Sequence, residues 1–306
     1  DSKMFLFENV KGLFSKKLDG KAGAMYNHIC EEFQSEIEGK ASFKLASVDK
    51  SEVLLKAIEY GIPQARERLF LVGVNRKYNS TYTYPEKTHG PNCKFDYVTV
   101  EDALMDLPQI NMGEKSEEKD YSFDIASLED GKRKNFLEIM HRNNTHAPEE
   151  IGYTNESVFN HKAPNHTVKM LERIKSIKQG ENMKKAYERL VKEGREEFAK
   201  QNFPKKLYAA RNRRLVPTEP SFTVTSHCLD EMVHPTLNRA LSPREAARLQ
   251  SFPDWYQFKG PFVKFHSDPE QDQYEQIGDA IPPLLGYALG KEVAKTLENI
   301  KKEQLL

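Results

Sequence analysis

The chain has 306 residues, with 46 Lys and Arg against 46 Asp and Glu, so its formal net charge is zero. This length allows one or two globular domains, and the balanced charge excludes a uniformly basic or acidic surface. The three cysteines Cys30, Cys93 and Cys228 are widely spaced and form no Cys-x-x-Cys pair, so neither a disulfide framework nor a metal site is expected. No apolar run reaches about 18 residues, which argues against a membrane-spanning helix and for an intracellular protein.

The N-terminal quarter alternates between strand and helix patterns. Apolar residues and their spacing predict strand, helix, strand, helix and strand at residues 4–7, 23–37, 43–48, 51–60 and 69–74. This order is that of part of a doubly wound α/β sheet. Proteins seldom begin inside a core strand, so we expect further residues, on this chain or on a partner, to precede Asp1.

Two candidate functional segments border these strands. Glu8 and Asn9 follow the first strand, where α/β folds place chemistry, although a turn with a capping Glu explains them equally well. Arg66 and Arg68 precede the last strand, and side chains two apart on an extended backbone share one face. Their guanidinium groups would converge on one anionic or carbonyl ligand, or would simply hold carboxylates on a solvated edge strand.

The middle of the chain is more irregular and locally basic. Short helices are predicted near residues 100–107, 167–177 and 184–201, and residues 111–120 form a charged loop. Between residues 160 and 215 there are roughly 16 Lys and Arg against about 6 Glu, which predicts a basic surface. The histidines at positions 141, 146, 161 and 166 fit no zinc spacing, so hydrogen-bonding or surface roles are expected for them.

A cluster of arginines at residues 207–217 differs from the charged helices before it. Arg211, Arg213 and Arg214 lie next to Tyr208 in a stretch without acidic residues, and a β-branched run at 223–225 follows. Arginines beside an aromatic residue on loops suit contact with phosphates and base edges. The alternative is a solvated basic surface without a ligand.

The clearest local structure is a short helix that starts at Ser242. Ser242 is the N-cap, Pro243 takes the first helical position and Glu245 lies three residues after the cap, so the helix runs to Leu249 and stops before Pro253. A second turn, at residues 276–283, leads into a terminal helix at residues 284–300.

Taken in order, these segments resemble the DNA cytosine-5 methyltransferase family. Residues 8–10 resemble its Glu-Asn-Val motif, and residues 64–68 its Gln-x-Arg-x-Arg motif. Residues 239–253 resemble its Arg-Glu-Ala-Ala-Arg-Leu-Gln-x-Phe-Pro helix, and residues 276–283 its last motif. The resemblance implies a Rossmann-like catalytic domain at residues 1–84, an inserted, mostly irregular target recognition domain at 85–235, and a return to the catalytic domain at 236–306.

The resemblance also implies a mechanism. In this family a cysteine thiolate adds to C6 of a cytosine flipped out of duplex DNA, and C5 then takes the methyl group of S-adenosylmethionine. Glu8 would be the acid at N3 and Arg68 the hydrogen-bond donor to O2, with Arg66 on a neighbouring phosphate or supporting the pocket.

The resemblance implies further contacts with the cofactor and with DNA. Asp279, Ala280 and Ile281 would contact the cofactor, although Asp279 stands where the family usually has Asn. The expected DNA-binding residues are Gln64, Arg211, Arg213, Arg214, Thr223 and Thr225.

The family's Gly-rich cofactor loop and its Pro-Cys nucleophile loop have no counterpart in this sequence, and none of the three cysteines follows a Pro. We therefore expect the C-terminal part or a split subunit of a bacterial, cytoplasmic, nucleoid-associated enzyme from a restriction-modification setting. Its partners would be double-stranded DNA and an N-terminal half carrying the nucleophile, with no metal. Two alternatives are a non-catalytic DNA-binding protein and a structural α/β protein.

Overall fold

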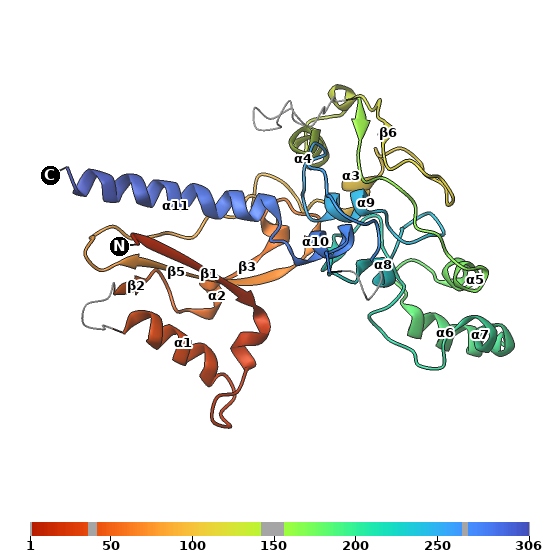
Figure 1. Ribbon diagram of the computed structural model, residues 1–306, viewed down its shortest axis with the longest axis horizontal. Helices are drawn as coiled ribbons and strands as arrows, with labels where there is room; N and C mark the ends of the chain where they lie inside the picture. Colours follow the sequence, from red (N-terminus) through yellow and green to blue (C-terminus); the bar gives the residue numbers. More distant parts are fainter. Residues whose placement is uncertain (1, 36–41, 142–155, 265–268, 306) are drawn as a thin grey trace.

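The computed structural model describes residues 2–35, 42–141, 156–264 and 269–305 (Figure 1). His146, residue 37 of the predicted first helix and Asp1 lie outside these ranges. Within them, no helix is long and apolar enough to cross a membrane, and no group of three or more His, Cys, Asp or Glu side chains is placed to hold a metal ion.

A four-stranded sheet organises the N-terminal part. Strand β5 (Glu67–Asn75) lies at its centre, with β1 (Met4–Val10) along one edge and both β2 (Phe43–Leu45) and β3 (Leu54–Lys56) along the other. All three neighbours pair antiparallel with β5, so β1 and β2 run parallel to each other. The predicted α/β class is confirmed.

Helices cover both faces of this sheet (Figure 1). Helix α1 (Ala24–Gln34) packs over Leu69 and Leu71 of β5, together with the 3-10 turn Lys11–Ser15. Helix α11 (Pro283–Glu303) packs over Phe70, Val72 and Val74, whose side chains point to the other face because strand side chains alternate. The terminal helix therefore returns to the sheet, more than 200 residues after β5 in sequence.

The helix predicted at residues 51–60 is wrong. The segment is divided into α2 (Lys50–Val53), strand β3 and a 3-10 turn, Ala57–Tyr60. Leu54 and Leu55 pair with Leu69 and Arg68 of β5. Hydrogen bonding to the edge of β5 therefore decides the local structure, although the spacing of the apolar side chains would also suit a helix. Gly61 then adopts a left-handed backbone conformation, with φ of +80°, and turns the chain toward β4 (Gln64–Ala65).

The middle of the chain is built from short elements. Their bounds, in chain order, are α3 Val100–Leu104, β6 Lys119–Asp120, a 3-10 turn Ile125–Ser127, α4 Lys132–His141, β7 Ser157–Val158, α5 Val168–Ser176, α6 Met183–Lys192, α7 Glu196–Asn202, β8 Arg213–Arg214, β9 Ser221–Phe222, α8 Cys228–Glu231 and β10 Met232–Val233. The helix predicted at residues 184–201 is interrupted, because Gly194 adopts φ of +75° between α6 and α7. The β-branched run at 223–225 is not a strand, and the strand β9 that precedes it pairs parallel with β4.

Helices α9 (Pro243–Leu249) and α10 (Gln273–Asp279) lie between the sheet and the middle segment (Figure 1). The capping box that the sequence predicts for α9 is present, since Ser242 and Glu245 exchange hydrogen bonds with each other's backbone. The largest core joins α9 and α10 to residues 98–140 of the predicted recognition domain. Residues on both sides of the boundary predicted at residue 235 therefore share one core. Of the helices after that boundary, α11 packs on the sheet, whereas α9 packs on the middle segment.

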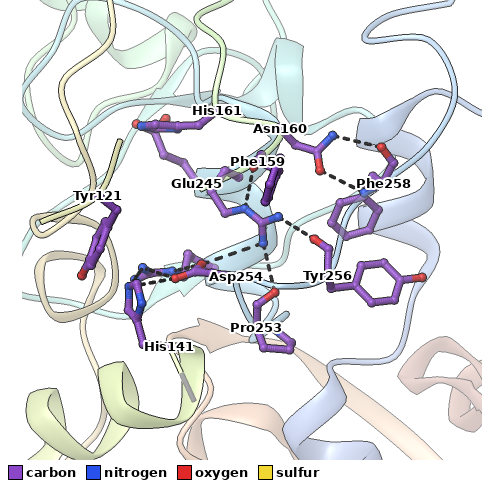
Figure 2. Close-up of polar contacts among 12 residues, drawn as sticks. Tyr121, His141, Phe159, Asn160, His161, Glu245, Pro253, Asp254, Tyr256 and Phe258 are labelled. Atoms are coloured by element: carbon purple, nitrogen blue, oxygen red, sulfur yellow. Dashed lines mark hydrogen bonds and ion pairs between the residues drawn. The ribbon is translucent and has the colours of Figure 1, made fainter. Parts of the chain in front are cut away.

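A buried ionic network fastens α9 to the middle segment. The guanidinium of Arg248 donates to both oxygens of Asp254 at 2.6 and 2.7 Å and to Asp106 at 3.0 Å, and the side chains of all three are completely buried. Asp254 also lies 3.0 Å from His141, which stacks on Tyr121 (Figure 2). Arg244 reaches backbone carbonyls of Phe159, Pro253 and Tyr256 (Figure 2).

The buried histidines have hydrogen-bonding roles, as expected for those that the structure describes. His161 contacts Ser242 and the Pro108 carbonyl, and His166 accepts from Ala240. Burial lowers the pKa of His89, His141, His161 and His166, and it lowers that of His234 to about 4.

These histidines predict acid sensitivity. A histidine whose pKa is lower in the folded than in the unfolded protein stabilises the fold above the unfolded pKa, about 6.5, and this stabilisation is lost as the pH falls through the folded value. We therefore expect the free energy of unfolding in urea to fall between about pH 6.5 and about pH 4. His234→Asn should reduce that slope, whereas His28→Asn, at an exposed position on α1, should leave it unchanged. If the free energy of unfolding changed equally with pH in the wild type and both variants, His234 would not contribute to the acid sensitivity.

Candidate active site

Glu8 and Arg68 form an ion pair on neighbouring strands. Glu8 stands opposite Phe70 and Arg68 opposite Val10, so the two side chains are diagonal neighbours on one face of the antiparallel pair. The Arg68 Nε lies 3.0 Å from the Glu8 Oε1, and the side chains keep 16% and 29% of their surface exposed. Both the carboxyl and the guanidinium are therefore partly accessible from outside the protein. Burial lowers the pKa of Arg68, and the contact with Glu8 opposes that change.

Arg66 lies beside this pair but is 97% buried, with only 3% of its surface exposed. Its pKa is lowered to about 10 by burial and by the nearby Arg68, whereas Glu8 and Asp279 raise it. It therefore stays protonated at neutral pH, close to Arg68, Glu8 and Asp279. Its hydrogen bonds go to backbone carbonyls, which fits support of the pocket rather than contact with a phosphate.

The expectation that Gln64 contacts DNA needs correction. Its side chain is completely buried, and its amide is used by Val224, Leu249 and Gln250. Nothing in the sequence around Gln64 signals this, because the partners lie about 160 to 186 residues away and are brought to it by tertiary folding.

The predicted DNA-binding arginines divide into two kinds. Arg211 is exposed and lies near Asp230 and Tyr208, and Arg213 lies over the Phe222 ring, 3.2 Å from its centroid. Arg214 is 6% exposed, and its guanidinium donates to four backbone carbonyls and to the side chain of Asn238. The prediction of a DNA contact for Arg214 therefore does not fit, since none of its donors is left for a phosphate.

Thr223 and Thr225 flank the buried Val224. The Thr223 hydroxyl donates to the Ala65 carbonyl at 3.1 Å, and the Thr225 hydroxyl donates to Glu231 at 2.9 Å. Glu231 also lies 3.6 Å from Arg213. The structure thus brings Thr223, Thr225 and Arg213 into one region next to β4.

The segment predicted to contact the cofactor is the turn between α10 and α11. Asp279 is exposed and accepts a hydrogen bond from Gln271 at 2.9 Å, Ala280 is half-buried, and Ile281 is 37% exposed. An exposed carboxylate beside an exposed apolar side chain fits the ammonium and hydroxyl donors and the flat apolar surface of S-adenosylmethionine.

Neither Cys30 nor Cys228 lies in the environment of a nucleophile. Cys30 lies on the buried face of α1, where burial raises its thiol pKa, and Cys228 is completely buried, with its pKa raised strongly for the same reason. The thiol of Cys93 lies 3.7 Å from the Lys87 carbonyl, in the loop after Gly90. No contact between these thiols and Glu8 or Arg68 occurs in the described residues.

A cavity of about 700 Å³ lies elsewhere, between the loop at residues 83–95, α4 and α11. Lysines 87, 94, 291 and 295 are at its border, and none of the predicted site residues lines it. We therefore place the candidate site at the partly open Glu8–Arg68 pair, on the basis of its chemistry rather than of cavity size.

The fold is shared with a solved structure. A crystal structure of a putative DNA modification methyltransferase encoded within a prophage (E. coli) superposes with a TM-score of 0.62, covering 97% of this chain and 70% of that chain at 24% sequence identity. The profile of the C-5 cytosine-specific DNA methylase family matches residues 1–295. The chain belongs to this family, which confirms the resemblance.

Type II methyltransferases are among its relatives. M.DdeI of Desulfomicrobium norvegicum is 32% identical over 301 residues, which cover 97% of this chain and 64% of M.DdeI. M1.HphI of Haemophilus parahaemolyticus is 29% identical over 97% of this chain and 58% of its own length. M.AquIB of Picosynechococcus is 31% identical over 153 residues, which are 49% of this chain and 97% of M.AquIB. The chain thus spans less than two thirds of M.DdeI and M1.HphI.

Proposed function

We propose that this chain supplies the base-activating and DNA-recognising parts of a DNA (cytosine-5) methyltransferase. The observation that carries the proposal is the partly exposed Glu8–Arg68 pair on adjacent strands. Arg68 follows shortly after β4 in the chain, and β4 pairs with β9 and accepts a hydrogen bond from Thr223 at the Ala65 carbonyl.

The pair matches the polar edge of a flipped cytosine. The Glu8 carboxyl holds a proton at N3 as charge develops in the ring, and Arg68 donates to O2, where the same charge accumulates. When S-adenosylmethionine is bound it supplies the methyl group, and Asp279, Ala280 and Ile281 would help to hold it. Because each contact strengthens in the transition state, the pair would increase turnover more than substrate affinity.

The nucleophile comes from polypeptide outside these 306 residues. The buried surroundings of Cys30 and Cys228 support this, as does the 64% coverage of M.DdeI. The short M.AquIB, aligned over 97% of its own length, is compatible with activities divided between chains.

A methylation assay tests this division. The purified 306-residue chain should transfer no methyl group to duplex DNA from labelled S-adenosylmethionine, and activity should appear when it is combined with the Pro-Cys-bearing segment of its own enzyme. The matched control is the same mixture with that cysteine changed to Ser. Methyl transfer by the chain alone would contradict the proposal.

DNA binding by the basic segment is tested by Arg211→Ala. Removal of one exposed phosphate contact should weaken binding of a mixed-sequence duplex several-fold and reduce the slope of log affinity against log salt by about 1. Arg76→Ala, an exposed arginine just after β5, is the control and should change neither. An unchanged affinity for Arg211→Ala would show that this arginine belongs only to a solvated surface. Arg214→Ala is unsuitable, because it removes buried structural contacts.

A further inference from the structure

A buried polar cluster joins three parts of the molecule that are distant in sequence. Gln64, Arg66 and Gln250, called here the junction cluster, come from the segment before β5 and from the end of α9. Gln64 and Gln250 are completely buried, and Arg66 is 3% exposed. Polar groups this deeply buried are costly unless they are bonded, so their partners indicate what the cluster does.

Arg66 binds two separate segments with one guanidinium. Its Nη1 donates to the Val224 carbonyl at 2.8 Å, and its Nη2 donates to the carbonyls of Gly278 and Ala280, both at 3.2 Å. Val224 lies between the recognition residues Thr223 and Thr225, whereas Gly278 and Ala280 flank Asp279 in the proposed cofactor turn. Only a planar fork with several donors can hold all three carbonyls at once.

The two glutamines tie the same segments together. The Gln64 amide accepts from the Val224 N–H at 2.8 Å and donates to Gln250 at 3.0 Å, and Gln250 donates to the Ile277 carbonyl at 2.8 Å. Both backbone polar groups of Val224 are thus held by junction side chains. The segments also touch directly, because a Cβ at Gly278 would lie 2.1 Å from the carbonyl carbon of Thr225.

We propose that Arg66 is a positioning residue that makes the recognition segment 223–225 and the turn 278–280 move as one unit with the strand that carries Arg68. Arg66 lies two residues before Arg68, so a displacement of either segment reaches the base-contacting arginine through the short backbone segment between them. This inference deepens the proposed function and depends on it for the roles of the two segments. Binding of DNA at one segment would then alter the other.

Hydrogen exchange of the 306-residue chain tests the mechanical link without any ligand. Arg66→Lys keeps the charge but loses the fork, so amides at 221–226 and at 277–282 should both exchange roughly tenfold or more faster, with the rest of the chain little changed. The matched control is Arg68→Lys, whose partner is Glu8, and its effect should be confined to β1 and β5. An increase in only one of the two segments would overturn the proposal.

A second variant covers the case in which Arg66→Lys does not fold. Gln250→Met preserves volume but cuts the amide links to Gln64 and Ile277. It should also accelerate exchange in both segments. Unchanged hydrogen exchange in both segments would also contradict the proposed coupling between them.

Transmission is tested by adding a mixed-sequence duplex. In the wild type, bound duplex should change hydrogen exchange both at residues 221–226 and at residues 277–282. In Arg66→Lys, bound duplex should change hydrogen exchange only at residues 221–226. A merely structural role would loosen both segments yet leave this response intact, so an equal response in the two proteins overturns the positioning role. If the wild-type chain binds no duplex, the proposed DNA-binding function fails, whereas the ligand-free exchange still decides the link.

Discussion

Glu8→Gln is expected to lower the methylation rate of the assembled enzyme by about 10² to 10⁴-fold while leaving its affinity for duplex DNA unchanged. Glutamine has the same shape and can still accept a hydrogen bond from Arg68, but it cannot give a proton to N3 of the base. Single-turnover methylation with saturating S-adenosylmethionine measures the chemical step, and an equilibrium titration of duplex measures binding.

The sequence offers a matched control for this substitution. Glu67 lies next to Arg68 in the chain, but its carboxylate pairs with Lys11 at 2.8 Å on the surface, so Glu67→Gln should change neither rate nor affinity. Parallel loss of binding and methylation in Glu8→Gln would instead assign Glu8 a structural role. Full methylation activity of Glu8→Gln would show that Glu8 takes no part in the chemical step.

Arg248→Met is expected to destabilise the protein by about 3 to 5 kcal/mol, the largest stability effect that we predict. Methionine fills much of the space, but Asp106 and Asp254 then lose the buried guanidinium that lies between them, and Asp254 keeps only the more distant Arg244, whose Nη1 is 3.9 Å away. Arg248 holds the pKa of Asp254 below its usual range despite burial, so this carboxylate is charged in the folded protein. The free energy of unfolding in urea, followed by far-UV circular dichroism, measures the effect.

Two variants separate the possible causes. Arg248→Lys keeps one positive charge without the two-sided fork, so its stability should lie between wild type and Arg248→Met. Lys200→Met removes a half-exposed pair with Glu196 on α7 and should cost less than about 1 kcal/mol. A loss below about 1 kcal/mol for Arg248→Met would mean that the network contributes little to the fold.

Sequence patterns over a few residues predicted those elements whose formation depends mainly on residues near them in the chain. Helix α9 follows from Ser242, Pro243 and Glu245 alone, because a cap is satisfied within four residues. Strand β5 follows from its apolar run, since a central strand is buried on both faces. The family resemblance implies that Glu8 and Arg68 contact the same base, and the register of β1 on β5 brings the two side chains together as an ion pair at 3.0 Å.

Predictions failed where distant segments decide the outcome. Residues 51–60 show helical spacing, yet the free edge of β5 draws Leu54 and Leu55 into a strand. Gln64 and Arg214 look like surface ligands in sequence. Each is buried by partners that folding brings together, from up to 186 residues away in the case of Gln64.

The sequence by itself determined the family, through the order of its four motifs, and the local caps and apolar runs that start and stop the main elements. The tertiary structure decided which polar side chains face a ligand and which face the interior. The physical reason is that a buried donor must find its acceptor wherever the fold places one, and nothing within a few residues of the donor shows where that is. Arg66 and Arg68 illustrate this, because two arginines of one motif have different surroundings: Arg66 is buried in the junction cluster, and Arg68 is in a partly exposed ion pair.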